Sequence, residues 1–132
     1  MSDDTPSVTA PIQMNIKIDL LSNAIVGAFE GGSTYWMHEC DYLTPKQDYA
    51  APAYSDPKFW HEGGRMKVFY DDPEDESKRA EFEFGLPEMI VGLTKMSEQS
   101  PGHFGDLIAE NDDAITHDCF VQYVIFGDVI YG

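Results

Sequence analysis

The sequence predicts a small α+β domain in which an antiparallel sheet, including a β-hairpin near residues 65–84, packs against three or four helices. Two patterns predict this fold class. Apolar and charged residues alternate strictly from Ala80 to Phe84, as expected for a strand with one buried face. Apolar residues recur three and four positions apart in 18–29 and 86–98, which is typical of amphipathic helices.

The first predicted helix covers residues 18–29. Asp19 suits its N-terminal cap or its first turn, where the helix dipole favours negative charge. Gly31-Gly32 is expected to end this helix in a left-handed conformation. Gly27 lowers helix stability and therefore predicts close packing against a neighbouring element. The apolar face consists of Ile18, Leu21, Ile25 and Phe29.

A strand is predicted from Tyr35 to Tyr42 because of its aromatic residues and its alternation. The following residues, 43–64, are rich in proline and aromatic side chains. We expect them to form a long irregular loop, with short strand pieces as the alternative. The side chains expected on one face of the strand are Trp36, His38, Cys40 and Tyr42.

The predicted hairpin pairs Arg65–Tyr70 with Ala80–Phe84 through a polar loop at 71–79. Its second strand turns alternate side chains toward the core and toward water. Arg65 and Lys67 are expected to pair across the ladder with the outward glutamates. The core-facing residues are Ala80, Phe82 and Phe84, and the outward ones are Glu81 and Glu83.

Two more helices are predicted after the hairpin. The first covers 86–98 and has Pro87 in its first turn, where a missing N–H costs little. A shorter one covers 103–110, after the Pro101-Gly102 break. Both would bury apolar side chains on one face.

Residues 118–126 are apolar nearly all round, so a buried helix and a strand compete. Thr116 as a cap, Asp118 in a first turn and Gly127 as a stop favour the helix. Residues 128–132 are expected to add an edge strand.

Residues 1–14 are predicted to be a flexible leader, and residues 15–132 a single domain. The leader lacks the basic residues and apolar core of a signal peptide, and no apolar run is long enough to span a membrane. These features predict a location in the cytoplasm of a bacterial host. Cys40 and Cys119 are expected to be free, buried thiols there.

The chain is strongly acidic, with 24 acidic and 8 basic residues and a formal net charge of −16. No Lys or Arg follows Lys95. Such a surface repels nucleic acid and anionic lipid and steers the protein toward basic partners. The alternative is that the charge serves solubility alone. The acids predicted to contact a partner are Glu98, Asp106, Glu110, Asp112 and Asp113.

Two stretches of the sequence stand out as motifs, one from Glu30 to Trp36 and one from Asp113 to Gly132. They resemble the two motifs of a family of small phage and prophage proteins whose function is mostly unassigned. The family's motifs are EGGxxYW and DAxTxDxxxQxxxFGxxxYG, and the hairpin and helix between them follow in the same order. The resemblance covers residues 15–132 and implies a phage setting. By analogy with other small phage proteins, it implies inhibition of a host defence component. The matching residues here are Glu30, Gly31, Gly32, Tyr35, Trp36, Asp113, Ala114, Thr116, Asp118, Gln122, Phe126, Gly127, Tyr131 and Gly132.

Two His-x-Cys sequences, His38–Cys40 and His117–Cys119, suggest a zinc site. A helix turns about 200° between positions i and i+2, so the second pair could not reach one ion together. Zinc motifs also leave two or more residues between paired ligands. We therefore expect no metal and no cofactor. No nucleophile motif is present, and no catalytic residue is predicted.

A nucleotide-like ligand is the alternative to a protein partner, since the few cations cluster in the sequence near aromatic residues. Aromatic residues at such positions are more often part of a core. The residues of this alternative site are Tyr35, Trp36, Trp60, Arg65, Lys67 and Arg79.

The leading hypothesis is thus a non-enzymatic phage protein that binds a basic surface on a bacterial host protein, without binding nucleic acid or membranes itself. Its acidic charge would mimic nucleic acid and inhibit a defence component. Sequestration of a small nucleotide-like signal is the first alternative, and an enzyme of unrecognised type the second. A homodimer through the apolar C-terminal segment is also considered.

Overall fold

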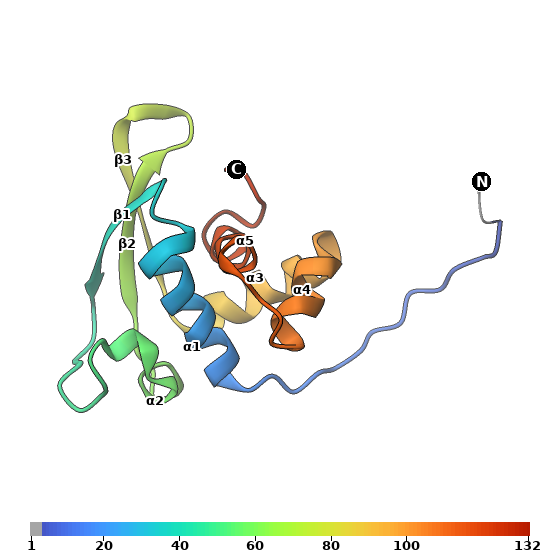
Figure 1. Cartoon of the computed structure of the whole chain (residues 1–132), viewed down its shortest axis with the longest axis horizontal. Coiled ribbons are helices and arrows are strands. Elements are labelled where there is room, and N and C mark those ends of the chain that lie inside the picture. Colours follow the sequence, from blue (N-terminus) through green and yellow to red (C-terminus); the bar gives the residue numbers. More distant parts are fainter. Residues whose placement is uncertain (1–3) are drawn as a thin grey trace.

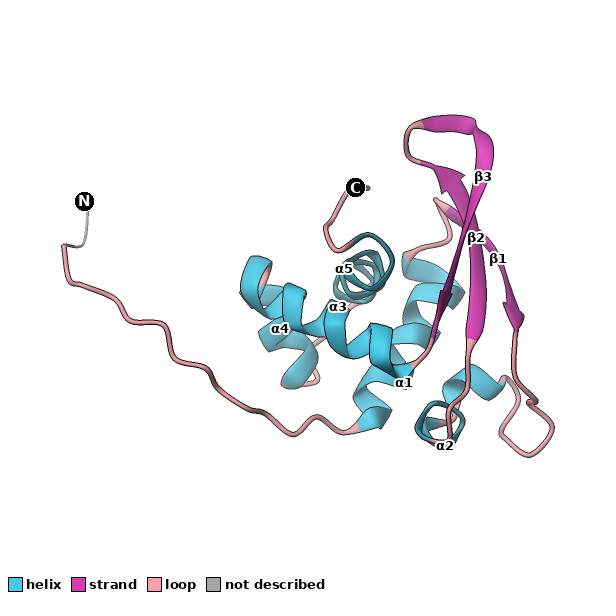
Figure 2. Ribbon diagram, turned by 180° about the vertical axis from the view of Figure 1, so that it is seen from behind, coloured by secondary structure: helices cyan, strands magenta, loops and turns pink. Residues whose placement is uncertain are grey.

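A computed structural model describes residues 4–132 and confirms the α+β class. Helices gather on one side of an open antiparallel sheet with strand order β1-β2-β3, and α2 lies beyond one end of it (Figures 1 and 2). The strands are β1 (Met37–Tyr42), β2 (Met66–Asp72) and β3 (Asp75–Phe84). The helices are α1 (Ile18–Gly27), α2 (Pro57–His61), α3 (Leu86–Gln99), α4 (Pro101–Ile108) and α5 (Ala114–Phe126).

Helix α5 lies at the centre of the helical layer, in contact with α1, α3 and α4. Helix α4 lies on the side of this layer farthest from the sheet (Figure 1). The core fills the space between the sheet and the helices with large apolar side chains that are almost fully buried. Among the largest are Trp36, Trp60, Phe59, Phe84, Phe120, Met66, Met89 and Met96.

The hairpin is longer than predicted. Residues 71–79 do not form a loop, because β2 continues to Asp72 and β3 begins at Asp75, leaving only a tight turn at 73–74. Residues 75–79 are exposed, so this end of the hairpin has no buried face and needs no apolar alternation. As predicted, Lys67 pairs with Glu81 and Glu83 across the ladder, whereas Arg65 instead bonds to Glu88 of α3.

The irregular segment 43–64 contains short helices instead of strand pieces. A 3₁₀ turn, η2 (Ala53–Ser55), precedes α2. Asp56 caps α2 by accepting a hydrogen bond from the backbone N–H of Lys58, and Pro57 occupies the first turn. This short helix places Phe59 and Trp60 in the core, which explains the aromatic residues in the segment.

The predicted left-handed end of the first helix at Gly31-Gly32 is wrong. Helix α1 widens into the π-helical turn η1 (Ala28–Gly32), and neither glycine has a positive φ. Gly32 instead allows η1 to pack closely against the first residue of α5, since a Cβ there would lie 2.5 Å from the backbone oxygen of Ala114. The predicted close packing at Gly27 is confirmed, because a Cβ would overlap the His117 ring.

Helix α5 confirms the choice of helix over strand for the last apolar segment. It begins at Ala114, earlier than predicted, and its cap is Asp113 in place of Thr116. Gly127 ends it in a left-handed conformation with a φ of 71°. Residues 128–132 do not form the predicted edge strand and fold back over α5 without regular structure.

Strand β1 begins two residues later than predicted. Residues 33–36 form a turn, and a register shift between Met37 and Glu39 interrupts the alternation. Trp36 is therefore buried from a turn and does not share a strand face with His38.

Candidate functional site

The two motifs of the family resemblance meet at Asp118, a buried carboxylate on α5. Its Oδ1 atom accepts hydrogen bonds from Ser33 Oγ and from Trp36 Nε1, both at 2.8 Å. Its Oδ2 atom accepts one from the Tyr35 hydroxyl at 2.6 Å and one from Gln122 Nε2 at 3.1 Å. All four donors are neutral, so hydrogen bonding alone satisfies this buried carboxylate.

Gln122, one turn further along α5, fastens the C-terminal segment. Its Oε1 atom accepts hydrogen bonds from the backbone N–H groups of Ile130 and Tyr131, both at 2.8 Å. Its Nε2 atom also donates to the Tyr131 carbonyl. The Tyr131 ring stacks on Trp36 with 5.3 Å between centroids and an interplanar angle of 8°. We call this assembly of Ser33, Tyr35, Trp36, Asp118, Gln122 and Tyr131 the polar joint.

A cavity of about 610 Å³ adjoins the polar joint. Its lining contains no Lys or Arg, so no cation is in place to hold a phosphate group. Burial raises the pKa of the Cys119 thiol, which disfavours the nucleophilic thiolate. Burial and the hydrogen bond to Asp118 raise the pKa of Tyr35 to about 12, so its hydroxyl stays a neutral donor. The other lining side chains with chemical potential are His103 and Ser100, whose partners are Thr116 and Tyr123.

The five acids predicted to contact a partner lie around α4 and fall into two groups. Asp112 pairs with His117, and Asp113 caps α5 by accepting from the Thr116 N–H. The hydrogen bonding to Thr116 lowers the pKa of Asp113. Glu98, Asp106 and Glu110 are exposed, and within residues 4–132 they have no side-chain hydrogen bond or ion pair.

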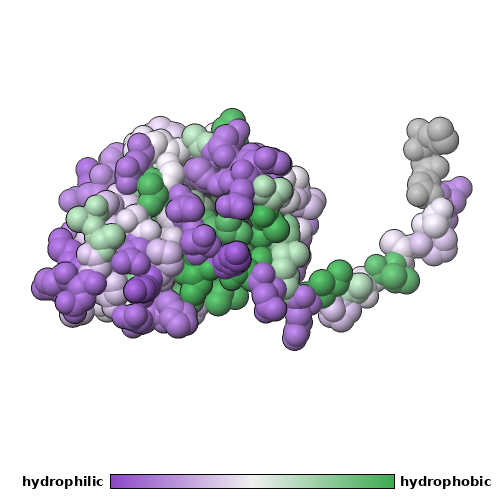
Figure 3. All heavy atoms as spheres, turned by 60° about the horizontal axis from the view of Figure 1, so that its bottom comes forward, coloured by the Kyte–Doolittle hydropathy of each residue, from purple (hydrophilic) through white to green (hydrophobic). Residues whose placement is uncertain are grey.

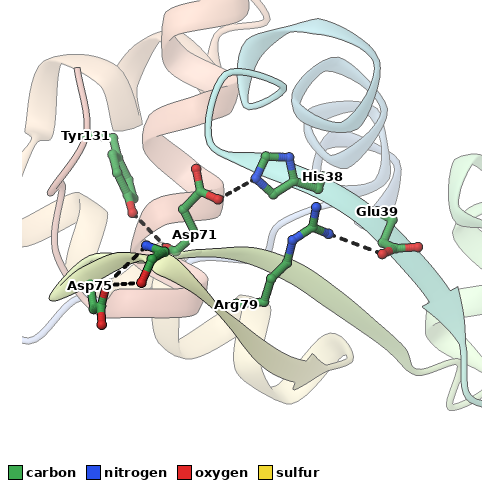
Figure 4. Close-up of polar contacts among 7 residues, drawn as sticks. His38, Glu39, Asp71, Asp75, Arg79 and Tyr131 are labelled. Atoms are coloured by element: carbon green, nitrogen blue, oxygen red, sulfur yellow. Dashed lines mark hydrogen bonds and ion pairs between the residues drawn. The ribbon is translucent and has the colours of Figure 1, made fainter.

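The cations of the alternative ligand site are not gathered around a common space. Arg65 pairs with Glu88, while Lys67 lies between Glu81 and Glu83. Arg79 of β3 donates to Glu39 of β1, across the intervening strand β2 (Figure 4).

The aromatic residues of that alternative site are also separated. Trp36 and Trp60 are 1% and 0% exposed, so neither ring face is open to a ligand. The Trp60 indole donates to the Tyr54 carbonyl, and its ring stacks on Phe84. Only Tyr35, which is 55% exposed, lines the cavity beside the polar joint.

The two His-x-Cys sequences have other partners. Figure 4 shows His38 of β1 directed at the Asp71 carboxylate of β2, at 2.6 Å, while Tyr131 donates to the Asp71 carbonyl. Cys40 and Cys119 are both free; Cys119 is buried as predicted, and Cys40 is half-buried. Within residues 4–132, no group of three or more potential ligands is placed to hold a metal ion.

Sequence reasoning identified every member of the polar joint except Ser33 as a motif residue but did not foresee the joint itself. Tyr35 and Trp36 lie 83 and 82 residues from Asp118, so their contact depends on the whole fold. The side-chain types of the two motifs could have predicted this contact. One motif supplies hydroxyl and indole donors, and the other supplies a carboxylate and an amide four residues apart on a predicted helix.

No known protein family, curated protein or solved structure matches this chain. In the part that the structure describes, no helix combines the length and the apolar character needed to cross a membrane.

Proposed function

We propose that the chain is a non-enzymatic binding protein that covers a basic surface of a bacterial protein and keeps an anionic ligand, such as nucleic acid, away from it. The observation that carries this proposal is the unpaired charge around α4. Glu98, Asp106 and Glu110 are exposed and have no internal partner among residues 4–132. We call these three residues the acidic face.

Among residues 4–132 no positive charge forms an ion pair with the acidic face, although Lys95 lies one turn before Glu98 on α3. Four of the positive charges are committed to ion pairs on the sheet and its edges, namely those of Arg65, Lys67, Lys78 and Arg79. No Lys or Arg follows Lys95 in the sequence. The potential of this side of the molecule therefore stays negative and favours association with a basic partner.

The chemistry of the cavity supports binding over catalysis. Its thiol has a raised pKa, its tyrosine hydroxyl has a pKa of about 12, and its one carboxylate already accepts four hydrogen bonds. The resemblance to small phage proteins supports the setting that we propose, which is inhibition of a host defence component in the bacterial cytoplasm.

The test is affinity capture from a bacterial lysate on the immobilised chain, with stepwise elution by salt and mass spectrometry of the eluate. We expect a basic protein to elute at moderate salt, because salt screens exposed charges. Retention of that protein should be lost in the triple variant Glu98→Lys, Asp106→Lys and Glu110→Lys.

The matched control reverses the same number of charges elsewhere, with Asp48→Lys, Glu74→Lys and Glu76→Lys. These three residues are also exposed and lie in the loop after β1 and at the hairpin tip. The control should keep the partner. Equal losses in both triple variants, or a partner that stays bound in about 1 M NaCl, would exclude a specific role of the acidic face.

A further inference from the structure

The residues before α1 differ from the rest of this acidic protein. From Thr5 to Ile16 the sequence contains no charged residue, although the chain as a whole carries −16. The segment is extended and runs away from the body of the molecule (Figures 1 and 2). Val8 is 91% exposed and Ile12 is 80% exposed. We call residues 5–16 the N-terminal arm.

A groove on the body begins where the arm leaves it. The groove has a volume of about 640 Å³ and is formed by the base of the arm together with α1, α3 and α4. Its lining contains no charged residue; Leu86, Ile90 and Phe104 supply much of the apolar wall. In Figure 3 apolar side chains gather on the body beside the base of the arm. Ile90 remains 53% exposed, so the groove is only partly filled.

The composition of the arm favours an extended conformation. An extended arm can lie along an apolar groove of another molecule but cannot easily turn back into the groove of its own chain. Pro6 and Pro11 hold their own φ values and bias the preceding residues toward extended conformations. No glycine precedes Gly27, so the arm lacks the residue that most readily reverses a chain. Fully extended, residues 4–16 span about 40 Å, which is enough to cross the face of a second molecule of this size.

The distribution of charge indicates how a second copy of the chain could bind in the groove. Two copies of a strongly anionic chain repel each other over most of their surface. The arm and the groove are the exception, because both are uncharged and apolar. A contact between them buries hydrophobic surface, and the arm and the groove lining themselves contribute no charged side chain to it.

We propose that two copies of this chain form a dimer in which each N-terminal arm lies in the groove of the other copy. The exchange is symmetric, since a two-fold arrangement uses the same two surfaces on both chains. This assembly goes beyond the proposed binding function, and it uses none of the acidic residues on which that function depends.

The test is sedimentation velocity on the full chain from roughly 1 to roughly 200 µM, in about 0.15 M NaCl, with the variants Val8→Asp in the arm and Ile90→Asp in the groove. Val8 is suited to this test because it does not line the groove of its own chain, whereas Ile12 does. We expect a concentration-dependent dimer whose dissociation constant rises about tenfold or more in each variant. Val91→Asp is the matched control, because Val91 neighbours Ile90 on α3, is 58% exposed and does not line the groove. Circular dichroism melts verify that all three variants fold.

Mixing the two variants distinguishes exchange between copies from docking within one copy. A mixed dimer has one intact contact, between the unaltered arm of the Ile90→Asp chain and the unaltered groove of the Val8→Asp chain. The mixture should therefore associate more tightly than either variant alone. A wild-type chain that stays monomeric over the whole range would overturn the proposal. So would a dimer insensitive to either substitution, or a mixture no tighter than its components.

Discussion

The carboxylate of Asp118 and those of the acidic face are the same chemical group in opposite settings. Asp118 is 8% exposed and accepts four hydrogen bonds from neutral donors. Glu98, Asp106 and Glu110 face water and have no internal partner among residues 4–132. The comparison teaches that the motif residues, which stand out most in the sequence, are occupied in holding the fold together. The carboxylates without an internal partner among residues 4–132 belong to residues that no motif marks.

Removing the Asp118 carboxylate should have the largest effect on stability. Asp118→Ala leaves the Ser33 hydroxyl and the Trp36 indole N–H buried without their acceptor. We expect the free energy of unfolding to fall by about 4 kcal/mol, measured by urea denaturation. Glu98→Ala removes a carboxylate from the acidic face and should leave the urea midpoint unchanged. Similar decreases in the free energy of unfolding for the two variants would show that the buried and the exposed carboxylate contribute equally to stability.

Glycine-to-alanine substitutions compare how tightly the backbone is packed beside the polar joint and in α4. Gly32→Ala would place a Cβ 2.5 Å from the Ala114 backbone oxygen, next to the polar joint. We expect it to lower the free energy of unfolding by about 2 kcal/mol, because backbone cannot move aside cheaply. Gly105→Ala lies within α4 and meets nothing within 4 Å. It should raise stability by up to about 1 kcal/mol through helix propensity, as thermal or urea unfolding would show. A stabilising Gly32→Ala would mean that the joint is loosely packed.

Asp113 lies between the two settings, since it is exposed and yet caps α5. Its hydrogen bonds with Thr116 lower its pKa in the folded state. A carboxylate with a lowered folded pKa contributes stability that is complete well above the unfolded pKa of about 3.9 and is lost as the pH falls through the folded value. The wild type should therefore melt at a higher temperature than Asp113→Ala at pH 7, and this difference should shrink in strong acid. A difference that stays constant from neutral to strongly acidic pH would rule out the carboxylate as the cause.

The helices were predictable where their apolar residues follow a clear period, as in α1 and α3. Helix α5 was predictable from its stop at Gly127, even though its apolar residues surround the whole helix. Prediction failed for residues 75–79, because a strand exposed on both faces has the composition of a loop. It also failed for α2, which is only five residues long and lies in a segment rich in proline.

The candidate sites were less predictable than the fold. The sequence left open whether Trp36 and Trp60 belong to the core or, as the alternative, to a ligand site with the cations, and the structure packs both rings in the core. Whether a strand or turn residue points inward depends on register, and the shift between Met37 and Glu39 is not visible in the sequence. The acids around α4 were identified from charge alone. That criterion did not separate the exposed carboxylates from Asp113, whose role as a cap depends on where α5 begins.

The position of Trp36 gives the polar joint an optical probe of its own. Its indole donates to a carboxylate and its ring stacks on Tyr131, whereas Trp60 stacks on Phe84 in a different part of the core. A Trp60→Phe chain would retain Trp36, beside Asp118, as its single tryptophan. Its emission wavelength and lifetime would then report whether a captured partner, or the approach of a second copy, opens the joint or leaves it closed.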